Sequence, residues 1–326
     1  MPGEFDIIKR YFATIAQKNE NSFGLMDDAA IFSPAADQAL VFTKDILIEN
    51  IHFRQDDKAS QIARKLLRVN LSDLAAMGAD PCGYLLGLSL PKETRFSEQW
   101  IEDFSNGLAN DIETFGGGLW GGDTVATTGP LTLSLTAIGS LPKGQEVLRS
   151  GARPGDDIYV SGTLGDAALG LRVLEGDLNI EKEDFSRALV SRYHLPRPRM
   201  ALGKSLRSIA SSMMDISDGL MGDIAHICAS SKCGARIYAD KLPLSDATQA
   251  VLQEHKKFAP MVWSGGDDYE LLFTADIGQR GQIMNCAEQC GVQVARIGVT
   301  TKELSAVLLD ENGDRLALAG EGYRHF

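Results

Sequence analysis

Aspartates recur along this chain of 326 residues, several of them beside glycine or beside a second aspartate. They stand at Asp27 and Asp28, Asp45, Asp73, Asp123, Asp215 with Asp218, and Asp267 with Asp268. Crowded carboxylates repel one another, and the formal net charge is already −12, so protons or cations must intervene. Hard divalent cations such as Mg²⁺ prefer oxygen ligands and often accompany phosphates. If the fold brings these residues together, the sequence predicts a site for several magnesium ions and a phosphorylated ligand.

Thr43, Lys44 and Asp45 close an apolar strand that we predict at 39–43. The end of a strand is where α/β sheets usually place ligands. His52 follows in the next loop. A lone histidine is more often structural or solvated than functional, so His52 is a candidate only in combination with its neighbours.

Asp215 ends a second predicted strand, at 212–215. Ser217 and Asp218 then precede a helix predicted at 219–230. Asp218 could simply cap that helix, because aspartate is a preferred N-cap residue. Contact with a metal or a nucleotide is the alternative interpretation, and these residues alone leave both open.

Asp73 lies among leucines and alanines on a helix predicted at 57–79, where it is either exposed or buried with a partner. Asp123 follows Gly121 and Gly122 in a predicted turn between strands at 119–123 and 130–141. Glycine lets the backbone approach a phosphate closely, and an aspartate beside it can hold a metal. A plain turn explains the same residues.

Other phosphate-binding patterns are weaker. Gly203-Lys204-Ser205 resembles the end of a P-loop, but the position of its first glycine is Pro198, and the segment fits a helix at 201–210. Arg149 and Arg153 lie in a Gly- and Pro-rich segment. Arginine suits phosphate oxygens, although solvation at the surface is its usual state.

Composition excludes several classes of protein. Hydrophobic residues make up 44% and charged residues 23%, as in ordinary globular proteins. A pI near 4.9 argues against a nucleic-acid-binding surface. No apolar run is long enough for a membrane span, and the segment MPGEFDIIKRYF lacks the apolar region of a signal peptide, so we predict a cytoplasmic protein. The five cysteines form no CxxC pair, which favours reduced, packed thiols over zinc. Neither G-x-S-x-G nor H-E-x-x-H occurs.

Strands alternate with helices in both halves of the chain, which predicts an α/β or α+β architecture. Besides the elements above, we predict helices at 5–16, 97–115 and 165–174, and strands at 84–91, 157–162, 235–240, 269–275 and 292–300. A segment rich in Gly, Pro and charge at 141–156 separates the halves. The predicted domains are therefore 1–142 and 143–326.

Many segments, in order along nearly the whole chain, resemble the thiamine-monophosphate kinase family, part of the superfamily of aminoimidazole ribonucleotide synthetase and selenophosphate synthetase. They are GEFDIIKRYF (3–12), DDAA (27–30), NLSDLAAMGADP (70–81), GGDT (121–124), RSGARPGD (149–156), SGTLGD (161–166), DISDGL (215–220), CGARI (233–237), SGGDDYEL (264–271) and GYRHF (322–326). NLSDLAAMGADP is typical of the superfamily. SGGDDYEL and the terminal GYRHF are specific to the family.

The resemblance implies an ATP-dependent kinase that converts thiamine monophosphate to thiamine diphosphate. It also implies a homodimer that pairs through the N-terminal sheet, with the C-terminal domain covering the active-site cleft. By motif position, Mg²⁺ binding is assigned to Asp28, Thr43, Asp45, Asp73, Asp123, Asp215 and Asp218, with Lys44 at a further metal-site position. ATP contacts are assigned to Gly122, Asp123, Arg149 and Ser217, and the thiamine phosphate pocket to His52, Asp267 and Tyr323.

Three residues depart from the family pattern. Met26 replaces the glycine that usually precedes the paired aspartates. Lys44 replaces a threonine-like residue, so one metal contact is either lost or supplanted by an ammonium that touches phosphate. Asp267 replaces a glutamate and shortens the side chain by one methylene. The last two leave the number of metal ions and the detail of the substrate pocket open.

Transfer to a phosphate acceptor requires two anions to meet, and like charges ~4 Å apart repel by about 1 kcal/mol even in water. Mg²⁺ would offset this repulsion. The acceptor oxygen is already deprotonated near neutral pH, so we expect no side-chain base and no covalent intermediate. The alternatives are another ATP-using enzyme of the same superfamily and a non-catalytic nucleotide sensor. A selenide enzyme would carry a reactive cysteine near its N-terminus, whereas the first cysteine here is Cys82.

Overall fold

A computed structural model describes residues 4–92 and 95–318. Tyr323 therefore lies outside the described residues. The chain divides into two compact units. Unit 1 comprises Met1–Leu74 and Ala79–Gly144, and unit 2 comprises Ala75–Gly78 and Gln145–Phe326. The fold is mixed α/β, as the sequence predicts.

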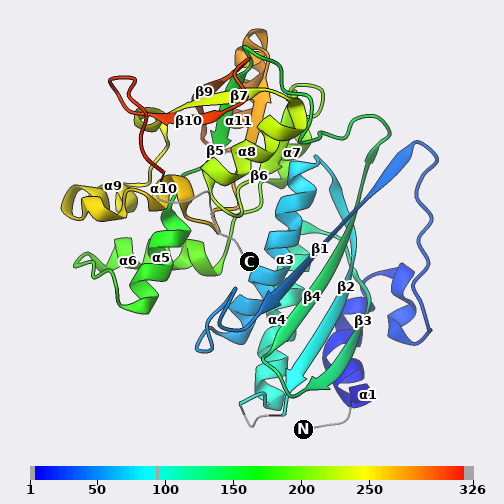
Figure 1. The fold of residues 1–326 in the computed structure, drawn as a ribbon. Helices are drawn as coiled ribbons and strands as arrows, with labels where there is room; N and C mark the ends of the chain where they lie inside the picture. Colours follow the sequence, from blue (N-terminus) through cyan, green and yellow to red (C-terminus); the bar gives the residue numbers. More distant parts are fainter. Residues whose placement is uncertain (1–3, 93–94, 319–326) are drawn as a thin grey trace. The chain divides into compact units, whose positions relative to one another are not determined.

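Unit 1 is built on a four-stranded sheet with the strand order β1-β4-β2-β3. Its strands are β1 (Gln38–Ile48), β2 (Asp80–Pro91), β3 (Leu119–Thr127) and β4 (Thr132–Pro142). β2 and β3 run parallel, and the other two pairs are antiparallel. Helices α3 (Ala59–Ala76) and α4 (Glu98–Phe115) lie along one face of this sheet (Figure 1). The opposite face of the sheet has no long helix in the described part of the chain.

The sheet's two faces follow from alternation along its strands. Leu47, Leu86 and Leu135 are buried beneath the helices, whereas Phe42 and Leu85 point to the opposite face and are 64% and 40% exposed. The N-terminal segment forms α1 (Glu4–Ile7), η1 (Ile8–Phe12), α2 (Ala13–Ala16) and η2 (Glu20–Leu25). We call the helix-free face, which carries Phe42 and Leu85, the open face.

Helices α3 and α4 pack closely because of Gly107. A Cβ at this position would come within 2.4 Å of the Ser60 carbonyl oxygen. The start of α4 is fixed by Ser97, whose side chain accepts a hydrogen bond from the Trp100 amide.

Unit 2 contains a six-stranded sheet with the order β10-β7-β9-β5-β8-β6. Its strands are β5 (Asp157–Ser161), β6 (Ser212–Asp215), β7 (Gly234–Tyr238), β8 (Leu271–Ala275), β9 (Val294–Thr301) and β10 (Ala306–Leu309). The α-helices are α5 (Asp166–Glu175), α6 (Glu183–His194), α7 (Met200–Ser205), α8 (Leu220–Ser231), α9 (Asp246–Glu254), α10 (Met261–Ser264) and α11 (Arg280–Cys290). Short 3₁₀ turns are η3 (Ala239–Lys241), η4 (Lys256–Phe258) and η5 (Ile277–Gln279). Two apolar clusters, around Ile224 and Phe273, make up most of its core.

Strands β1 and β3 both continue beyond the C-terminal ends that the sequence predicts. β1 continues to Ile48, so Thr43 and Asp45 lie in mid-strand rather than at its end. β3 continues to Thr127, so Gly121 and Gly122 belong to a strand and the predicted turn is wrong. A polar residue that alternates with apolar ones inside a strand looks like the end of that strand when only the sequence is considered.

The sequence analysis did not predict α6, α9, α11 or β10. β10 is a run of only four apolar residues, and a run of this length does not distinguish a strand from a buried helix segment. Lys204 lies within helix α7, which confirms that its Gly-Lys-Ser triplet is not a P-loop.

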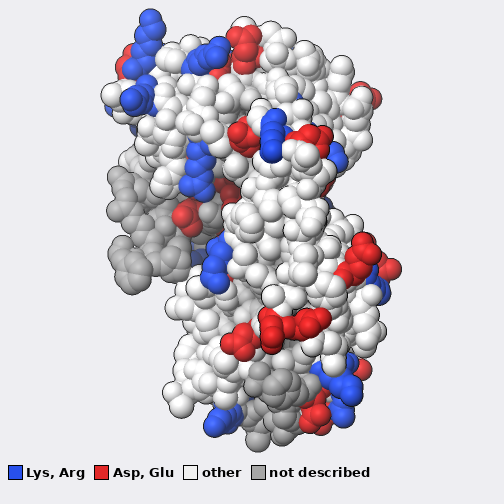
Figure 2. All heavy atoms as spheres, turned by 90° about the vertical axis from the view of Figure 1, so that its right-hand side faces the viewer, with Lys and Arg blue, Asp and Glu red and all other residues white. Residues whose placement is uncertain are grey.

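The surface of the described residues matches the acidic composition. On the face drawn in Figure 2, basic and acidic side chains are interspersed, and the described residues there form no broad basic patch. None of the helices among these residues is long and apolar enough to cross a membrane.

Candidate functional site

Thr43, Asp45 and Asp73 form a polar group between β1 and α3. The Thr43 hydroxyl donates a short hydrogen bond to Asp73 Oδ2. Burial, together with the negative charge of Asp73, raises the pKa of Asp45 to about 7. Two carboxylates this close cannot both ionise freely without a compensating cation. Their oxygens and the threonine hydroxyl are the hard donors that Mg²⁺ prefers, so the group fits that ion.

Lys44 points away from this group. Side chains alternate along β1, and Lys44 is exposed on the open face together with Phe42 and Ile46. A protonated ammonium has no lone pair, so any metal contact at Lys44 would use its main-chain carbonyl.

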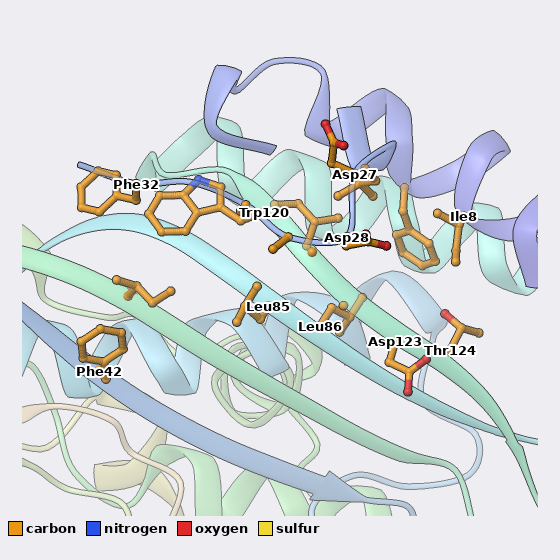
Figure 3. Close-up of a pocket in the computed structure, with 18 of the residues that line it drawn as sticks. Ile8, Asp27, Asp28, Phe32, Phe42, Leu85, Leu86, Trp120, Asp123 and Thr124 are labelled. Atoms are coloured by element: carbon orange, nitrogen blue, oxygen red, sulfur yellow. The ribbon is translucent and has the colours of Figure 1, made fainter. Parts of the chain in front are cut away.

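A cavity of about 560 Å³ lies on the open face of unit 1. Asp28, Gly122 and Asp123 all line it. Figure 3 shows Asp28 and Phe32 on the segment that crosses the sheet, with Asp123 on a strand beneath. Phe32 packs on Trp120, with ring centroids 4.9 Å apart, and so supplies an apolar wall. The cavity thus combines carboxylates, a glycine-rich strand and aromatic surface.

Gly122 has a packing reason to be glycine. A Cβ there would lie 2.1 Å from the Leu86 carbonyl oxygen on the neighbouring strand β2. The position would therefore exclude other residues even without a ligand in the cavity.

The structure does not bring all the predicted metal ligands of unit 1 together. Asp45 pairs across the strands with Leu135, Leu135 with Leu86, and Leu86 with Gly122, which precedes Asp123. β1 and β3 are therefore opposite edges of the sheet, roughly 14 Å apart at ~4.8 Å per strand. Asp45 faces the helices, whereas Asp123 lines the cavity on the open face.

His52 is half-buried in the turn after β1. Its Nδ1 accepts a hydrogen bond from the Ile48 amide at 3.0 Å, and its carbonyl accepts one from Lys65 Nζ at 3.0 Å. Since Nδ1 is an acceptor, neutral His52 carries its proton on Nε2.

In unit 2, strand β6 ends at Asp215, and the 216–219 turn leads into α8. The helix begins after Gly219, at a φ of 113° that favours glycine, and Asp218 does not cap it. Asp223, inside α8, instead holds the preceding turn: its Oδ2 accepts hydrogen bonds from the Ser217 and Asp218 amides at 3.0 and 3.2 Å. Burial, with the charge of Asp218, raises the pKa of Asp223 to about 7.

Residues 264–271 lie directly against this turn. The Asp267 amide donates to the Ser217 carbonyl at 2.9 Å, and the Tyr269 amide donates to the Ile216 carbonyl at 2.8 Å. Asp267 is thereby placed beside the turn that carries Asp215, Ser217 and Asp218. The structure thus brings these four predicted residues together.

Arg149 is exposed and lies beside the first half of β6, where Leu148 accepts a hydrogen bond from the Met213 amide. Asp215 is at the other end of that strand. Among the residues that the structure describes, no group of three or more His, Cys, Asp or Glu side chains converges as a metal centre would require. Within the described part of the chain, Asp45 lies near Asp73 and Asp218 near Asp223.

Sequence reasoning assigned no site role to three buried acidic residues beside the predicted ones. They are Asp223, Asp268 and Glu270, each at most 1% exposed. Asp223 lies in the first turn of a helix, a position that its sequence context could have indicated. Asp268 and Glu270 alternate with Asp267 and Tyr269 in SGGDDYEL, and only the structure shows which pair is buried.

Comparisons with known proteins agree with this architecture. Residues 26–141 match the N-terminal domain of AIR synthase related proteins, and residues 153–310 match the C-terminal domain. A thiamine-monophosphate kinase of Salmonella typhimurium is 40% identical over 325 residues, covering 99% of this chain and 98% of that protein. One from Bacillus subtilis is 30% identical over 328 residues, covering 99% of each.

Solved structures give the same result. A thiamine-monophosphate kinase from Stenotrophomonas maltophilia aligns with a TM-score of 0.86 at 40% identity, covering 96% of this chain and 98% of that one. A complex of AaThiL with AMPPCP and TMP aligns at 0.78 with 28% identity, covering 99% and 96%. The hydrogenase maturation protein HypE of E. coli, at 20% identity and 0.80, shares the fold.

Proposed function

The chain belongs to the thiamine-monophosphate kinase family, and from that premise we propose how its residues transfer a phosphoryl group from ATP to thiamine monophosphate. The products are thiamine diphosphate and ADP. The observation that carries this function is the similarity to thiamine-monophosphate kinases over 99% of the chain. The AaThiL complex with AMPPCP and TMP supports both substrates.

The cavity on the open face is our candidate for binding ATP. Its apolar wall of Phe32 and Trp120 suits an aromatic base, and its Gly122–Asp123 strand suits phosphates. Arg149 and Ser217 of unit 2 are the further ATP contacts that we propose. An arginine fork complements phosphate oxygens, and it is already charged at every relevant pH.

Magnesium binding is assigned in unit 1 to Thr43, Asp45, Asp73, Asp28 and Asp123, and in unit 2 to Asp215 and Asp218. When bound, Mg²⁺ supplies the positive charge that offsets repulsion between two phosphorylated substrates. The carboxylates supply oxygen ligands, which disfavour cations that prefer nitrogen or sulfur. Lys44 lies on the opposite face of the sheet from Asp45, so its side chain does not displace the oxygen ligands of Asp45 and Asp73.

The acceptor needs little chemical activation from the protein. A phosphate monoester has a second pKa near ~6, so its oxygen is already a nucleophile at neutral pH. His52, Asp267 and Tyr323 are the residues that we propose to hold this substrate. Neutral His52 would offer its Nε2–H as a hydrogen-bond donor. We propose direct transfer, with no phosphorylated side chain, because the acceptor oxygen needs no activation by a base.

We also propose that the protein is a homodimer that pairs through the open face. Phe42, Ile46, Leu85 and Val125 on this face are 64%, 48%, 40% and 48% exposed, a large apolar surface for an isolated sheet. A two-fold axis parallel to the strands would set β1 of one copy opposite β3 of the other. The strands that carry Asp45 and Asp123 would then face each other across the two copies, with the Asp45 side chain on the helix side of its own sheet. The cytoplasmic location of the protein is a prediction from its sequence alone.

An ADP-release assay with purified protein and Mg²⁺ tests the function. Thiamine monophosphate, thiamine and an aminoimidazole ribonucleotide precursor are compared as acceptors, with chromatography of the product. We expect ADP release only with thiamine monophosphate, in a one-to-one ratio with thiamine diphosphate. Turnover with another acceptor alone would reassign the chain within its superfamily, and ATP binding without turnover would favour a nucleotide sensor.

A further inference from the structure

The two residues on either side of Asp268 in the 264–271 loop have unusual backbone conformations. Asp267 has a φ of 71° and Tyr269 a φ of 49°, in the left-handed region. An aromatic residue rarely adopts this conformation, so the surrounding structure must enforce it. Between and after them, Asp268 and Glu270 are buried, at 1% and 0% exposure. The loop thus alternates between two outward residues and two anchors.

Asp268 is the first anchor. Both of its carboxylate oxygens accept the Gly165 amide, at 3.1 and 2.8 Å. Gly165 directly precedes helix α5, at a φ of 82°. The Asp268 carbonyl also accepts a hydrogen bond from Arg192 at 3.1 Å. Side chain and backbone of Asp268 are therefore both tied to rigid elements of unit 2.

Glu270 is the second anchor. Its carboxylate accepts two bonds from Arg199, at 2.6 and 2.5 Å, and one each from Arg192 at 2.8 Å and from the Ser161 hydroxyl at 2.5 Å. Gly162 makes room for it, since a Cβ there would lie 2.1 Å from Glu270 Oε1. A buried carboxylate with this many donors has one defined position.

Main-chain hydrogen bonds connect the anchored loop to the turn at the candidate site. The amides of Asp267 and Tyr269 bond to the carbonyls of Ser217 and Ile216, and the Ile216 amide bonds back to the Glu270 carbonyl at 2.8 Å. A shift of either anchor would rotate the peptide groups on which Asp267 is mounted. Neither anchor faces outward, so each would act through Asp267.

We propose that Asp268 and Glu270 are positioning residues that fix the strained backbone presenting Asp267 to the phosphorylated thiamine substrate. This inference rests on the proposed function, because it takes Asp267 as a substrate contact. It adds a specificity-determining role for two residues that touch no substrate. Arg199 and Gly165 are the partners through which the two anchors act.

A double-mutant cycle tests the inference. Asp268→Ala removes the acceptor of the Gly165 amide, and Asp268→Asn restores an acceptor of the same shape. We expect Asp268→Ala to raise KM for thiamine monophosphate about tenfold and Asp268→Asn to recover most of the loss. In an Asp267→Ala background, the same Asp268→Ala change should raise KM less than about twofold. An equal rise in both backgrounds would overturn the inference, because Asp268 would then act independently of Asp267.

A second variant keeps the test valid where Asp268→Ala does not fold. Arg199→Lys keeps the charge but loses the two-pronged contact with Glu270. Its matched control is Arg187→Lys, in a surface pair with Asp184 where the arginine side chain is 67% exposed. Arg199→Lys should reproduce the KM effect and its dependence on Asp267, whereas the control should change neither. Equal behaviour of the two variants would contradict the role of Glu270.

Amide hydrogen exchange separates this inference from the proposed function. If Asp267→Ala alone leaves KM unchanged, Asp267 is not a substrate contact, and the proposed pocket is wrong. The anchors are then judged by exchange at the Asp267 and Tyr269 amides. Asp268→Ala should accelerate both, with exchange in β7 unchanged. Unaltered exchange at these two amides would overturn the positioning role itself.

Discussion

Asp45 and Asp123 stand at opposite edges of one four-stranded sheet, on strands β1 and β3. Three strand spacings separate them, roughly 14 Å. Ligand oxygens lie only about 2.1 Å from a bound Mg²⁺, so within one copy of the sheet these two carboxylates cannot share an ion. Either they hold different ions, or the second copy of the proposed dimer completes each site.

Mixed dimers distinguish these possibilities. Asp45→Asn and Asp123→Asn should each be inactive alone. If one site uses Asp45 of one copy and Asp123 of the other, a mixed dimer keeps one intact site. Unfolding and refolding the two variants together should then restore about a quarter of wild-type activity, since half the dimers are mixed and each has one working site. No recovery, with mixed dimers demonstrated by a tag on one variant, would contradict a shared site.

Lys44→Thr tests whether the lysine ammonium takes part in metal binding. Lys44 faces away from Asp45 and Asp73, so its replacement should leave their donor set unchanged. We expect the Mg²⁺ concentration for half-maximal activity to change by less than about twofold. A shift of about tenfold or more would show that this side chain acts at the metal site.

Asp267→Glu restores the residue typical of the family. The longer side chain should reach the substrate as well or better, so we expect kcat to be retained and KM for thiamine monophosphate to be equal or lower. Steady-state kinetics with varied thiamine monophosphate at saturating ATP measures this. A large loss would mean that the pocket is built around the shorter aspartate.

The stability of the protein should fall with rising pH because of Asp268. Burial raises the pKa of this carboxyl well above its ordinary value of 3.8, so the native state keeps a proton that the unfolded state has lost. The contribution of Asp268 to the free energy of unfolding is complete at pH values at or below its ordinary pKa. It is lost as the pH rises toward the pKa of the native state. Asp268→Asn should flatten this part of the profile in urea unfolding. An unchanged slope in the variant would assign the pH dependence to other groups.

The sequence predicts the local elements around the candidate residues better than the distances between those residues. DISDGL was correctly read as a strand, a turn and a helix, because each of these depends on a few adjacent residues. The separation of Asp45 from Asp123 depends on strand order, which is set by contacts between distant segments. Local patterns carry no information about which strands become edges.

Alternation along β1 could have shown that Lys44 and Asp45 face opposite sides, had the strand been extended to Ile48. By contrast, no local pattern distinguishes Asp267 from Asp268, since both are aspartates in one loop. Their opposite burial follows from the positive φ at Asp267 and from the Gly165 amide. Which loop residues are buried is therefore decided by the residues that bond to the loop, and not by the loop sequence itself.

We propose that paired carboxylates carry phosphoryl transfer by holding magnesium. The most direct measurement is kcat of Asp45→Asn at saturating Mg²⁺, beside Asp37→Asn, which alters an exposed aspartate just before β1. We predict that Asp45→Asn retains a wild-type unfolding profile but loses activity by about a hundredfold or more, while Asp37→Asn stays near wild type. A near-normal kcat in Asp45→Asn would contradict the account.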